Sequence, residues 1–210
     1  MYIPLKPILD KYNIPTTGII HVGANIGQEY VDYKKWGIKN IVFIEPCKEA
    51  FDVVSKIKDE NVICINVACG SEEAELPMHI SKQNQGQSNS FRKSVLHSIE
   101  HPDVLFTETE MIKIIPIDSL PIEKTKYNIL VTDCEGYDSE VMKGAKQTLK
   151  HIDLVYSEIN RSETREGNKL IGDFEKLLWD EGFVMIETFW PSPNLSWGDS
   201  VFIKRELYNG

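Results

Sequence analysis

The hydrophobic positions of this 210-residue chain fall into short apolar runs separated by segments with helical spacing. The apolar runs at 18–22, 40–44, 62–67, 128–132 and 152–157 predict buried strands. Between most of them, apolar residues recur with the period of a helix, at 28–36, 48–58, 138–150 and 172–181. Strands that alternate with helices in this way are typical of an α/β fold with a parallel, doubly wound sheet.

Both ends of the chain depart from the alternation. Within residues 1–15, the spacing over 4–13 predicts an N-terminal helix that Pro15 ends. Near the C-terminus, "GFVMIETFW" and "DSVFIKREL" predict two strands, and the Pro-rich connection between them has no room for a crossover helix. These two strands are therefore expected to pair antiparallel at one edge of the sheet.

One long internal segment lacks any clear period. Residues 81–110 are polar, and they include "SKQNQGQSNSFRKS". A loop of this length inside a compact domain is usually a lid or a binding segment. We therefore expect a single domain over residues 1–210, with 81–110 as its lid or substrate-binding loop.

Composition narrows the classes of partner. The net charge of -9 and the absence of a dense basic face oppose binding to nucleic acid. The four cysteines lack C-x-x-C spacing, so a zinc site and a disulfide framework are not indicated, and a reducing, cytoplasmic setting fits better. No segment has the length of a membrane span or the pattern of a signal peptide, so no membrane anchor is expected.

The stretch "IIHVGANIGQEY" places Gly23 and Gly27 between a predicted strand and a helical pattern. This junction lies at the carboxyl edge of the sheet, where ligands bind. A dinucleotide fingerprint needs G-x-G-x-x-G, which disfavours a hydride-transfer enzyme, and no Walker lysine follows. About twenty residues further on, Glu45 ends the next strand, where an acidic residue can accept both hydroxyls of a ribose. Together these features indicate adenosine without pyrophosphate, which S-adenosylmethionine satisfies.

The sequence resembles the FkbM-type methyltransferases, a family within the class I group that uses S-adenosylmethionine. The resemblance rests on segments that occur in the family's order: "HVGANIGQ", "FIEPCKEAF", "NVACG", "SNSF", "DCEGYDSEVMKGA" and "SEIN". It implies a Rossmann-like, seven-stranded, mostly parallel sheet with an antiparallel last strand, and O-methylation, often of sugar hydroxyls. Two positions differ from the family's pattern, because the family commonly has Asp in place of His21 and a serine in place of Asn89.

The reading of the strand ends and the resemblance together assign roles to individual residues. The residues expected to bind the cofactor are His21, Gly23, Asn25, Gly27, Glu45, Ala68, Ser90 and Asp133. Asp133 and Glu158 follow two neighbouring predicted strands and are the candidate catalytic bases. Asp133 and Glu135 could instead cap the helix that follows them.

The acceptor of the methyl group is expected to contact Glu135, Asn160 and Trp197. His97 and His101 have a spacing that suits a metal on a helix face, but Pro102 follows and no third ligand stands out, so no metal site is predicted. A histidine of this pair could also swing in as the base.

Several functions stay open at this point. The leading hypothesis is an O-methyltransferase that acts on a sugar or glycoconjugate. The alternatives are a methyltransferase for another small natural product, a noncatalytic binding protein with a cofactor fold and, more remotely, an NAD-type dehydrogenase. The expected partner is a small-molecule or glycan acceptor, and the sequence leaves open a homo-oligomer or a place in a larger glycan-building protein.

Overall fold

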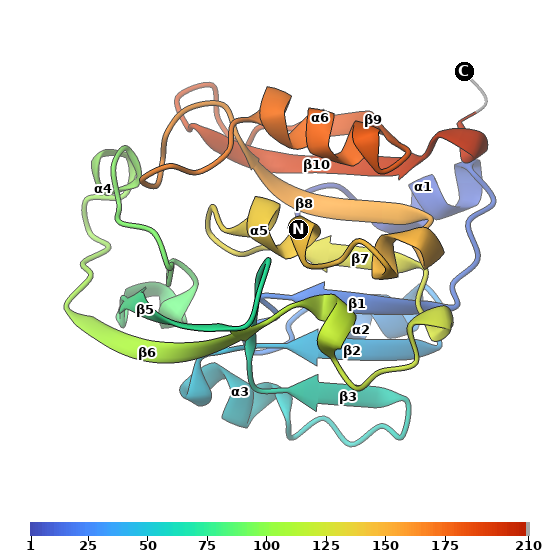
Figure 1. The fold of residues 1–210 in the computed structure, drawn as a ribbon, viewed down its shortest axis with the longest axis horizontal. Coiled ribbons are helices and arrows are strands. Elements are labelled where there is room, and N and C mark those ends of the chain that lie inside the picture. The colour runs from blue at the N-terminus through green and yellow to red at the C-terminus, as the bar shows by residue number, and fades with distance from the viewer. Residues whose placement is uncertain (209–210) are drawn as a thin grey trace.

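A computed structural model describes residues 1–208 of the chain and shows a central sheet of seven strands with helices on both faces (Figure 1). The strand order is β3-β2-β1-β7-β8-β10-β9. The strands are β1 (Gly18–Val22), β2 (Asn40–Ile44), β3 (Val62–Ile65), β7 (Ile129–Thr132), β8 (Leu154–Asn160), β9 (Phe183–Phe189) and β10 (Trp197–Lys204). Strands β3, β2, β1, β7 and β8 pair in parallel, whereas β10 pairs antiparallel with both β8 and β9. The predicted fold class is confirmed.

Two apolar clusters fill the space between the sheet and its helices. Ile20 belongs to one cluster and Ile19 to the other, because neighbouring residues of a strand point to opposite faces. The cluster around Ile20 packs against α5 (Asp138–Lys143) and α6 (Ile171–Asp180). The opposite cluster packs against α1 (Leu5–Lys11), α2 (Tyr30–Lys35) and α3 (Lys48–Val54). The five parallel strands thus end together at one edge of the sheet, with both faces covered.

A second, smaller sheet lies beside the first and was not predicted. It has the order β4-β6-β5 and consists of β4 (Ala68–Cys69), β5 (Ala74–Ile80) and β6 (Glu108–Ile115). Most of β6 is exposed, so its sequence carries no strong apolar signal. The segment expected to be a loop over 81–110 is therefore the long connection of a β5–β6 hairpin. It contains the short helix α4 (His97–Glu100) and a 3-10 turn, Gln83–Gly86, and β6 takes its last residues.

The predicted helix over 138–150 is divided in the structure. Helix α5 ends at Lys143, and a separate 3-10 turn covers Thr148–His151. Gly144 follows α5 and lies against the backbone of Gly70: a Cβ atom on Gly144 would be 1.9 Å from the Gly70 carbonyl oxygen. The end of α5 therefore packs directly against the backbone that follows β4 of the smaller sheet. Further 3-10 turns are Ile117–Ser119, Lys124–Lys126 and Arg205–Leu207.

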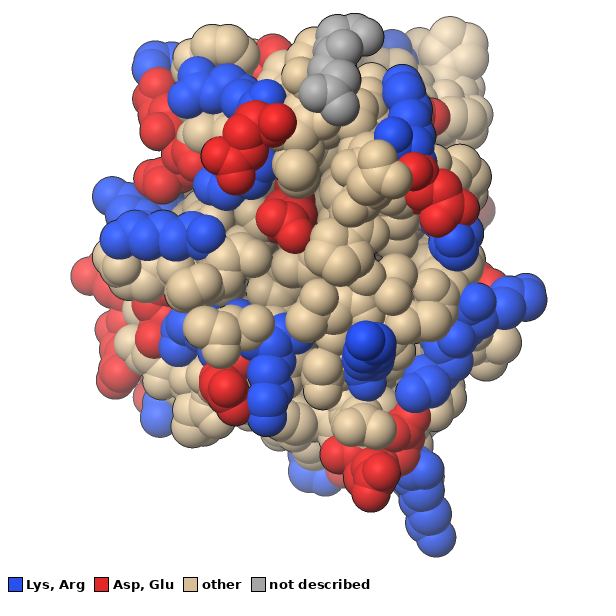
Figure 2. Space-filling view, turned by 90° about the vertical axis from the view of Figure 1, so that its right-hand side faces the viewer, with Lys and Arg blue, Asp and Glu red and all other residues tan. Residues whose placement is uncertain are grey.

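The amino ends of the parallel strands lie at the opposite edge from their carboxyl ends. Figure 2 views the molecule from this side, and Lys and Arg side chains are interspersed there with Asp and Glu. This face therefore offers no continuous basic surface. Among residues 1–208, no helix has the length and apolar character needed to cross a lipid bilayer.

Replacing Gly144 by Ala is expected to destabilise the fold by on the order of 3 kcal/mol, because the new methyl group overlaps a backbone carbonyl that cannot move freely. The matched control is Gly172→Ala in α6, where an added Cβ meets nothing within 4 Å. That change should stabilise the protein by about 0.5 kcal/mol. Urea unfolding of both variants measures the difference, and equal stabilities would contradict the packing described here.

Candidate functional site

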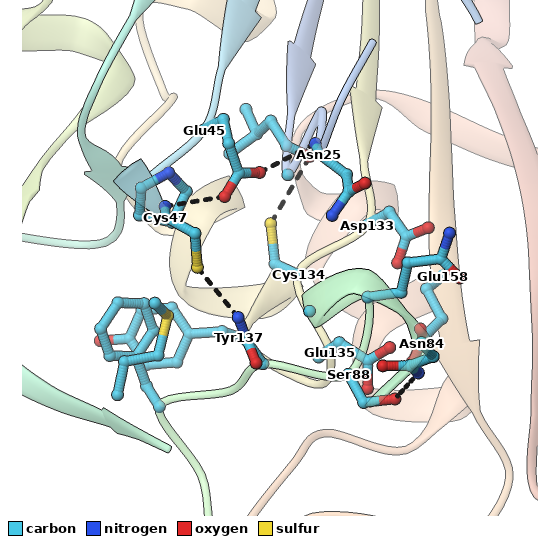
Figure 3. Close-up of a pocket in the computed structure, with 18 of the residues that line it drawn as sticks. Asn25, Glu45, Cys47, Asn84, Ser88, Asp133, Cys134, Glu135, Tyr137 and Glu158 are labelled. Atoms are coloured by element: carbon cyan, nitrogen blue, oxygen red, sulfur yellow. Dashed lines mark hydrogen bonds between the residues drawn. The ribbon is translucent and has the colours of Figure 1, made fainter. Parts of the chain in front are cut away.

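A cavity of about 510 Å³ opens at the carboxyl ends of β1, β2, β7 and β8, beneath the segment that joins β5 to β6. We call it the main cavity, and Figure 3 shows residues that line it. Parallel strands of an α/β sheet deliver polar side chains to this edge, because loops rather than buried strand residues follow there. The main cavity therefore occupies the position at which ligands bind in such sheets.

One end of the main cavity is formed by the glycine turn after β1. Gly23 has a φ of +79°, and a Cβ atom there would be 2.0 Å from the carbonyl oxygen of Asp133, so only glycine fits. Asn25 follows in a left-handed conformation, and its backbone N–H donates to Oε2 of Glu45 at 2.8 Å. The backbone N–H of Cys47 donates to the other oxygen, Oε1, also at 2.8 Å.

The two hydrogen bonds hold the Glu45 carboxylate in a single orientation. Its side chain is buried but lines the main cavity, so each oxygen keeps a lone pair for a ligand. Burial raises the pKa of Glu45, and the two backbone N–H donors oppose that rise. The Glu45 carboxylate is therefore held in an orientation from which it can accept hydrogen bonds from a ligand in the main cavity.

The structure brings five of the eight predicted cofactor residues to the main cavity: Gly23, Asn25, Glu45, Ala68 and Asp133. The other three lie outside its lining. His21 points to the opposite face of the sheet, where its Nδ1 and the hydroxyl of Tyr33 are 2.9 Å apart in a hydrogen bond. Successive side chains of a strand point to opposite faces of the sheet. Because Val22 points to the same face as the cluster around Ile20, its neighbour His21 points to the other face.

Gly27 and Ser90 have structural positions near the cavity. A Cβ on Gly27 would be 2.6 Å from a methyl group of Val54, so this glycine allows close packing against α3. The hydroxyl of Ser90 donates to the backbone carbonyl of Glu135 at 2.8 Å and thereby holds the loop after β7. Both residues shape the site from behind its lining.

Three carboxylates converge at the floor of the main cavity. Asp133, Glu135 and Glu158 each place one oxygen within 4.8 Å of the others, and we call them the carboxylate cluster. Asp133 follows β7, and its side chain lines the cavity and is exposed to water there, although protein atoms surround it. Burial, followed by repulsion between the like charges, raises the pKa of Asp133 and of Glu158 well above the usual range.

The carboxylate cluster has the chemistry of a site for a positively charged group. Carboxylate oxygens are the preferred ligands of hard divalent cations such as Mg²⁺, and they also stabilise organic cations. The sequence predicted no metal site, because it indicates neither the closeness of these three residues nor their shared orientation. The three side chains could hold such a cation or face the charged end of a cofactor.

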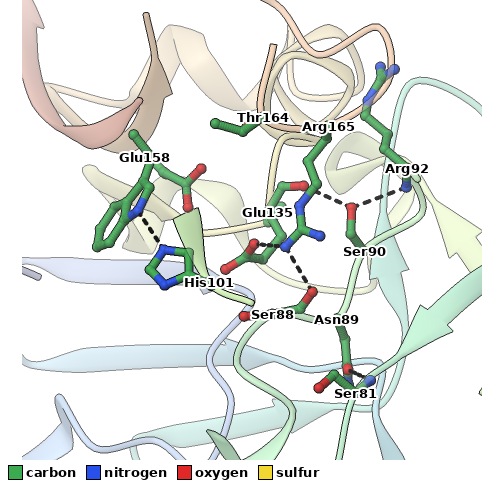
Figure 4. Close-up of polar contacts among 12 residues, drawn as sticks. Ser81, Ser88, Asn89, Ser90, Arg92, His101, Glu135, Glu158, Thr164 and Arg165 are labelled. Atoms are coloured by element: carbon green, nitrogen blue, oxygen red, sulfur yellow. Dashed lines mark hydrogen bonds and ion pairs between the residues drawn. The ribbon is translucent and has the colours of Figure 1, made fainter. Parts of the chain in front are cut away.

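Arg165 balances part of this negative charge, and sequence reasoning missed it. Its side chain is 1% exposed and forms an ion pair with Glu135, as Figure 4 shows. The guanidinium also donates to the carbonyl oxygen of Ser88 at 3.0 Å and lies over the ring of Phe106, 5.1 Å from the ring centre. Burial raises the pKa of Glu135, and the Arg165 charge opposes that rise. An arginine in a polar loop is ordinarily exposed, so no local pattern signals this position.

The segment between β5 and β6 closes the upper side of the main cavity. The side-chain amide of Asn25 donates to the carbonyl oxygen of Gln85 at 3.2 Å, and that of Asn89 donates to Sγ of Cys47 at 3.0 Å. Its residues Ser88, Phe91 and His101 line the cavity. The segment is therefore tied to both sides of the site.

The end of the main cavity near β10 is aromatic. Trp197 lines it, and the indole N–H donates to Nε2 of His101 at 3.2 Å. The ring of Tyr2 lies 5.9 Å from that of Trp197. Of the predicted acceptor residues, Glu135 and Trp197 line the main cavity, whereas Asn160 does not. Asn160 instead donates from its amide to Glu158 at 3.1 Å and so holds that carboxylate in place.

Comparison with protein families gives one match that spans most of the chain. A family model described as "Methyltransferase FkbM domain" matches residues 21–185. That range contains the glycine turn, Glu45, the carboxylate cluster and Arg165. Among curated proteins, none matches the chain at a significant level.

Solved structures share the fold at very low sequence identity. The magnesium protoporphyrin IX methyltransferase of Synechocystis PCC 6803, with bound SAM, has a TM-score of 0.54 and 7% identity, covering 95% of this chain and 77% of that one. An S-adenosylmethionine dependent methyltransferase from Mesorhizobium loti has a TM-score of 0.54 and 7% identity, covering 97% and 99%. The 1,6-didemethyltoxoflavin-N1-methyltransferase of Burkholderia thailandensis has a TM-score of 0.53 and 9% identity, covering 96% and 76%. These likenesses establish the fold alone.

Replacing Arg165 by Met is expected to lower the free energy of unfolding by about 3 kcal/mol, because Glu135 loses its only buried cationic partner among the described residues. The double variant Arg165→Met, Glu135→Gln should recover part of that loss, since no unpaired charge is left. Chemical denaturation of wild type, both single variants and the double variant gives the four free energies of unfolding that a double-mutant cycle needs. A double variant no more stable than Arg165→Met would show that charge compensation is not the reason for the pair.

His21 makes the fold sensitive to acid. Burial lowers its pKa to about 3, whereas an unfolded histidine has a pKa of about 6.5. Between these values the unfolded chain binds a proton that the folded chain does not, so stability is complete above pH 6.5 and falls as the pH drops towards 3.

The variant His21→Asn keeps a hydrogen-bonding group near Tyr33 but does not titrate. Wild type should therefore lose about 1.4 kcal/mol more stability per pH unit than this variant between pH 6 and pH 4. Urea unfolding at several pH values measures the slopes, and the exposed His151→Gln provides a surface control. Parallel slopes for wild type and His21→Asn would refute the assignment.

Proposed function

The chain belongs to the FkbM methyltransferase family, and we propose that it transfers a methyl group to a hydroxyl of a sugar or glycoconjugate. It is an S-adenosylmethionine-dependent methyltransferase. The observation that carries the finer proposal is the position of the carboxylate cluster between the glycine turn and the aromatic end of the main cavity. A hydroxyl is a weak nucleophile, and a carboxylate with a raised pKa is a suitable base for it.

The residues of the main cavity fit the cofactor. S-adenosylmethionine supplies a methyl group on a positively charged sulfur. Glu45, fixed by the N–H groups of Asn25 and Cys47, offers two carboxylate oxygens to the ribose hydroxyls. Ala68, which the sequence predicts to bind the cofactor, lines the main cavity. The negative carboxylate cluster complements the charged sulfur.

Glu158 is the better placed of the two candidate bases. Asp133 follows β7, which lies between β1 and β8, and its carbonyl oxygen packs against Gly23 of the cofactor turn. Glu158 belongs to β8, one strand further towards the aromatic end formed by Trp197 of β10. This strand order supports Asp133 as the residue beside the cofactor and Glu158 as the one beside the acceptor.

In the proposed reaction, Glu158 removes the proton of the acceptor hydroxyl while the oxygen attacks the methyl carbon. The cofactor, when bound, would supply the methyl group to that oxygen and leave as neutral S-adenosylhomocysteine. The chain contributes orientation as well as the base, since a displacement of this kind needs the oxygen in line with the breaking bond. Trp197 provides a flat apolar surface against which a sugar ring can pack.

Glu158→Gln is expected to reduce kcat by about 100-fold or more while the affinity for S-adenosylhomocysteine changes little, because the amide keeps the shape of the side chain but accepts no proton. The exposed Glu166→Gln serves as the matched control. The assay follows transfer of labelled methyl groups to free deoxyhexoses and other sugars, with added Mg²⁺ in one arm and EDTA in another. Cofactor binding without transfer to any hydroxyl compound would overturn the proposed acceptor class.

A further inference from the structure

The connection between β1 and α2 carries a carboxylate that has no role in the site described so far. Glu29 immediately precedes α2 and lines the main cavity. Two hydrogen-bonded turns bring it there. The N–H of Gly27 donates to the carbonyl oxygen of Ala24 at 2.8 Å, and the N–H of Tyr30 donates to that of Gly27 at 3.0 Å. The chain therefore reverses after β1 and keeps Glu29 at the carboxyl edge of the sheet.

Two acceptor atoms of this connection have no hydrogen-bond partner within residues 1–208. They are Oε2 of Glu29 and Oδ1 of Asn25, and both atoms are buried. The amide nitrogen of Asn25 donates to Gln85, which identifies Oδ1 as the atom left over. Buried polar atoms of folded proteins are nearly always satisfied. Because both residues line the main cavity, that cavity is the space from which a donor can reach them.

Glu29 lies where β1 and β7 end. Its carbonyl oxygen accepts the N–H of Tyr33 at 2.9 Å, and the Tyr33 hydroxyl bonds to His21 of β1. Burial, and then the nearby charges of Glu29 and of Asp133 after β7, raise the pKa of that hydroxyl, so both carboxylates lie near it. Glu45 follows β2, on the other side of β1. A cofactor with its ribose at Glu45 can therefore reach Glu29 with its amino-acid end.

We infer that Glu29 binds the ammonium group at the methionine end of the cofactor, with Oδ1 of Asn25 as a second acceptor. An ammonium group has three N–H donors and no acceptor, which suits a pair of unpartnered acceptor atoms. Its positive charge suits a carboxylate, and hydrogen bonds between charged partners are the strong ones. The inference concerns the cofactor, so it does not depend on which acceptor is methylated.

The charges around Glu29 favour a cation at this position. Burial raises its pKa, so the carboxylate is costly to ionise without a positive partner. The α-amino group of Met1 opposes that rise through space, but Oε2 accepts no hydrogen bond from it. No Lys or Arg among residues 1–208 lines the main cavity. A bound ammonium group would therefore meet no competing basic side chain there.

The test pairs the residue with the ligand group and is measured by calorimetric titration. The ligands are S-adenosylhomocysteine and its deaminated analogue, which keeps the carboxylate and the adenosine but has hydrogen in place of the ammonium group. Wild type should bind the analogue about 10-fold more weakly. Glu29→Gln should bind S-adenosylhomocysteine about 10-fold more weakly than wild type does, and the analogue equally well, because the analogue lacks the group that Glu29 contacts.

Two further variants locate the effect. Asp32→Asn removes an exposed carboxylate from the first turn of α2 and should change neither affinity. Glu45→Gln should weaken the binding of both ligands by the same factor, because both carry the ribose. Selectivity for the ammonium group is therefore lost only in Glu29→Gln.

Equal losses for both ligands in Glu29→Gln would show that the residue only shapes the turn. Unchanged affinities would show that Glu29 serves the amino group of Met1 or a water molecule. Either result overturns the inference. A crystal structure of wild type with S-adenosylhomocysteine tests it even if the variant does not fold: an ammonium nitrogen bonded to Glu29 supports it, and one bonded elsewhere refutes it. Since no methyl transfer is measured, failure of the proposed acceptor class would leave these results unaffected.

Discussion

Repulsion among three carboxylates is the constraint on which the site depends. Asp133, Glu135 and Glu158 present oxygens within 4.8 Å of one another, and two charges at that distance repel by about 3 kcal/mol at an effective dielectric constant of 20. Two features reduce this repulsion. Glu135 forms an ion pair with the buried Arg165, and the pKa values of Asp133 and Glu158 are raised, which favours their neutral forms. A carboxylate that is costly to ionise also accepts a proton more readily than an ordinary one.

The same constraint links segments that are far apart in the sequence. Glu135 follows β7, Arg165 follows β8, and Ser88, which accepts a hydrogen bond from Arg165, lies between β5 and β6. An isolated bridge between Ser94 and Arg165 adds a backbone connection between the second and third of these segments. Arg165 thus both compensates the charge of Glu135 and holds the segment between β5 and β6 over the cavity. A shift of the upper segment would move the only cation paired with the cluster in the described chain.

The parts of this arrangement that could be predicted from the sequence are those encoded locally. Gly23 and Glu45 stand at the ends of successive strands, and adjacent strand ends meet at one edge, so their proximity follows from order and spacing. His21 is different: it sits in the right motif, but strand alternation turns it towards Tyr33, and only the register of the sheet decides this. Arg165 depends on a contact across 30 residues, and β6 is too exposed to show an apolar period, so neither was predicted.

Charge balance links the proposed chemistry to the carboxylate cluster. In the proposed reaction, the carboxylate cluster faces a positive sulfur before transfer; afterwards the sulfur is neutral, and the proton taken by Glu158 replaces the lost positive charge. The net charge of the cavity is therefore unchanged across the chemical step, which spares buried groups a reorganisation. In the same proposed reaction, loss of that proton makes the cluster more negative again. A more negative cluster favours a cationic cofactor over its neutral product.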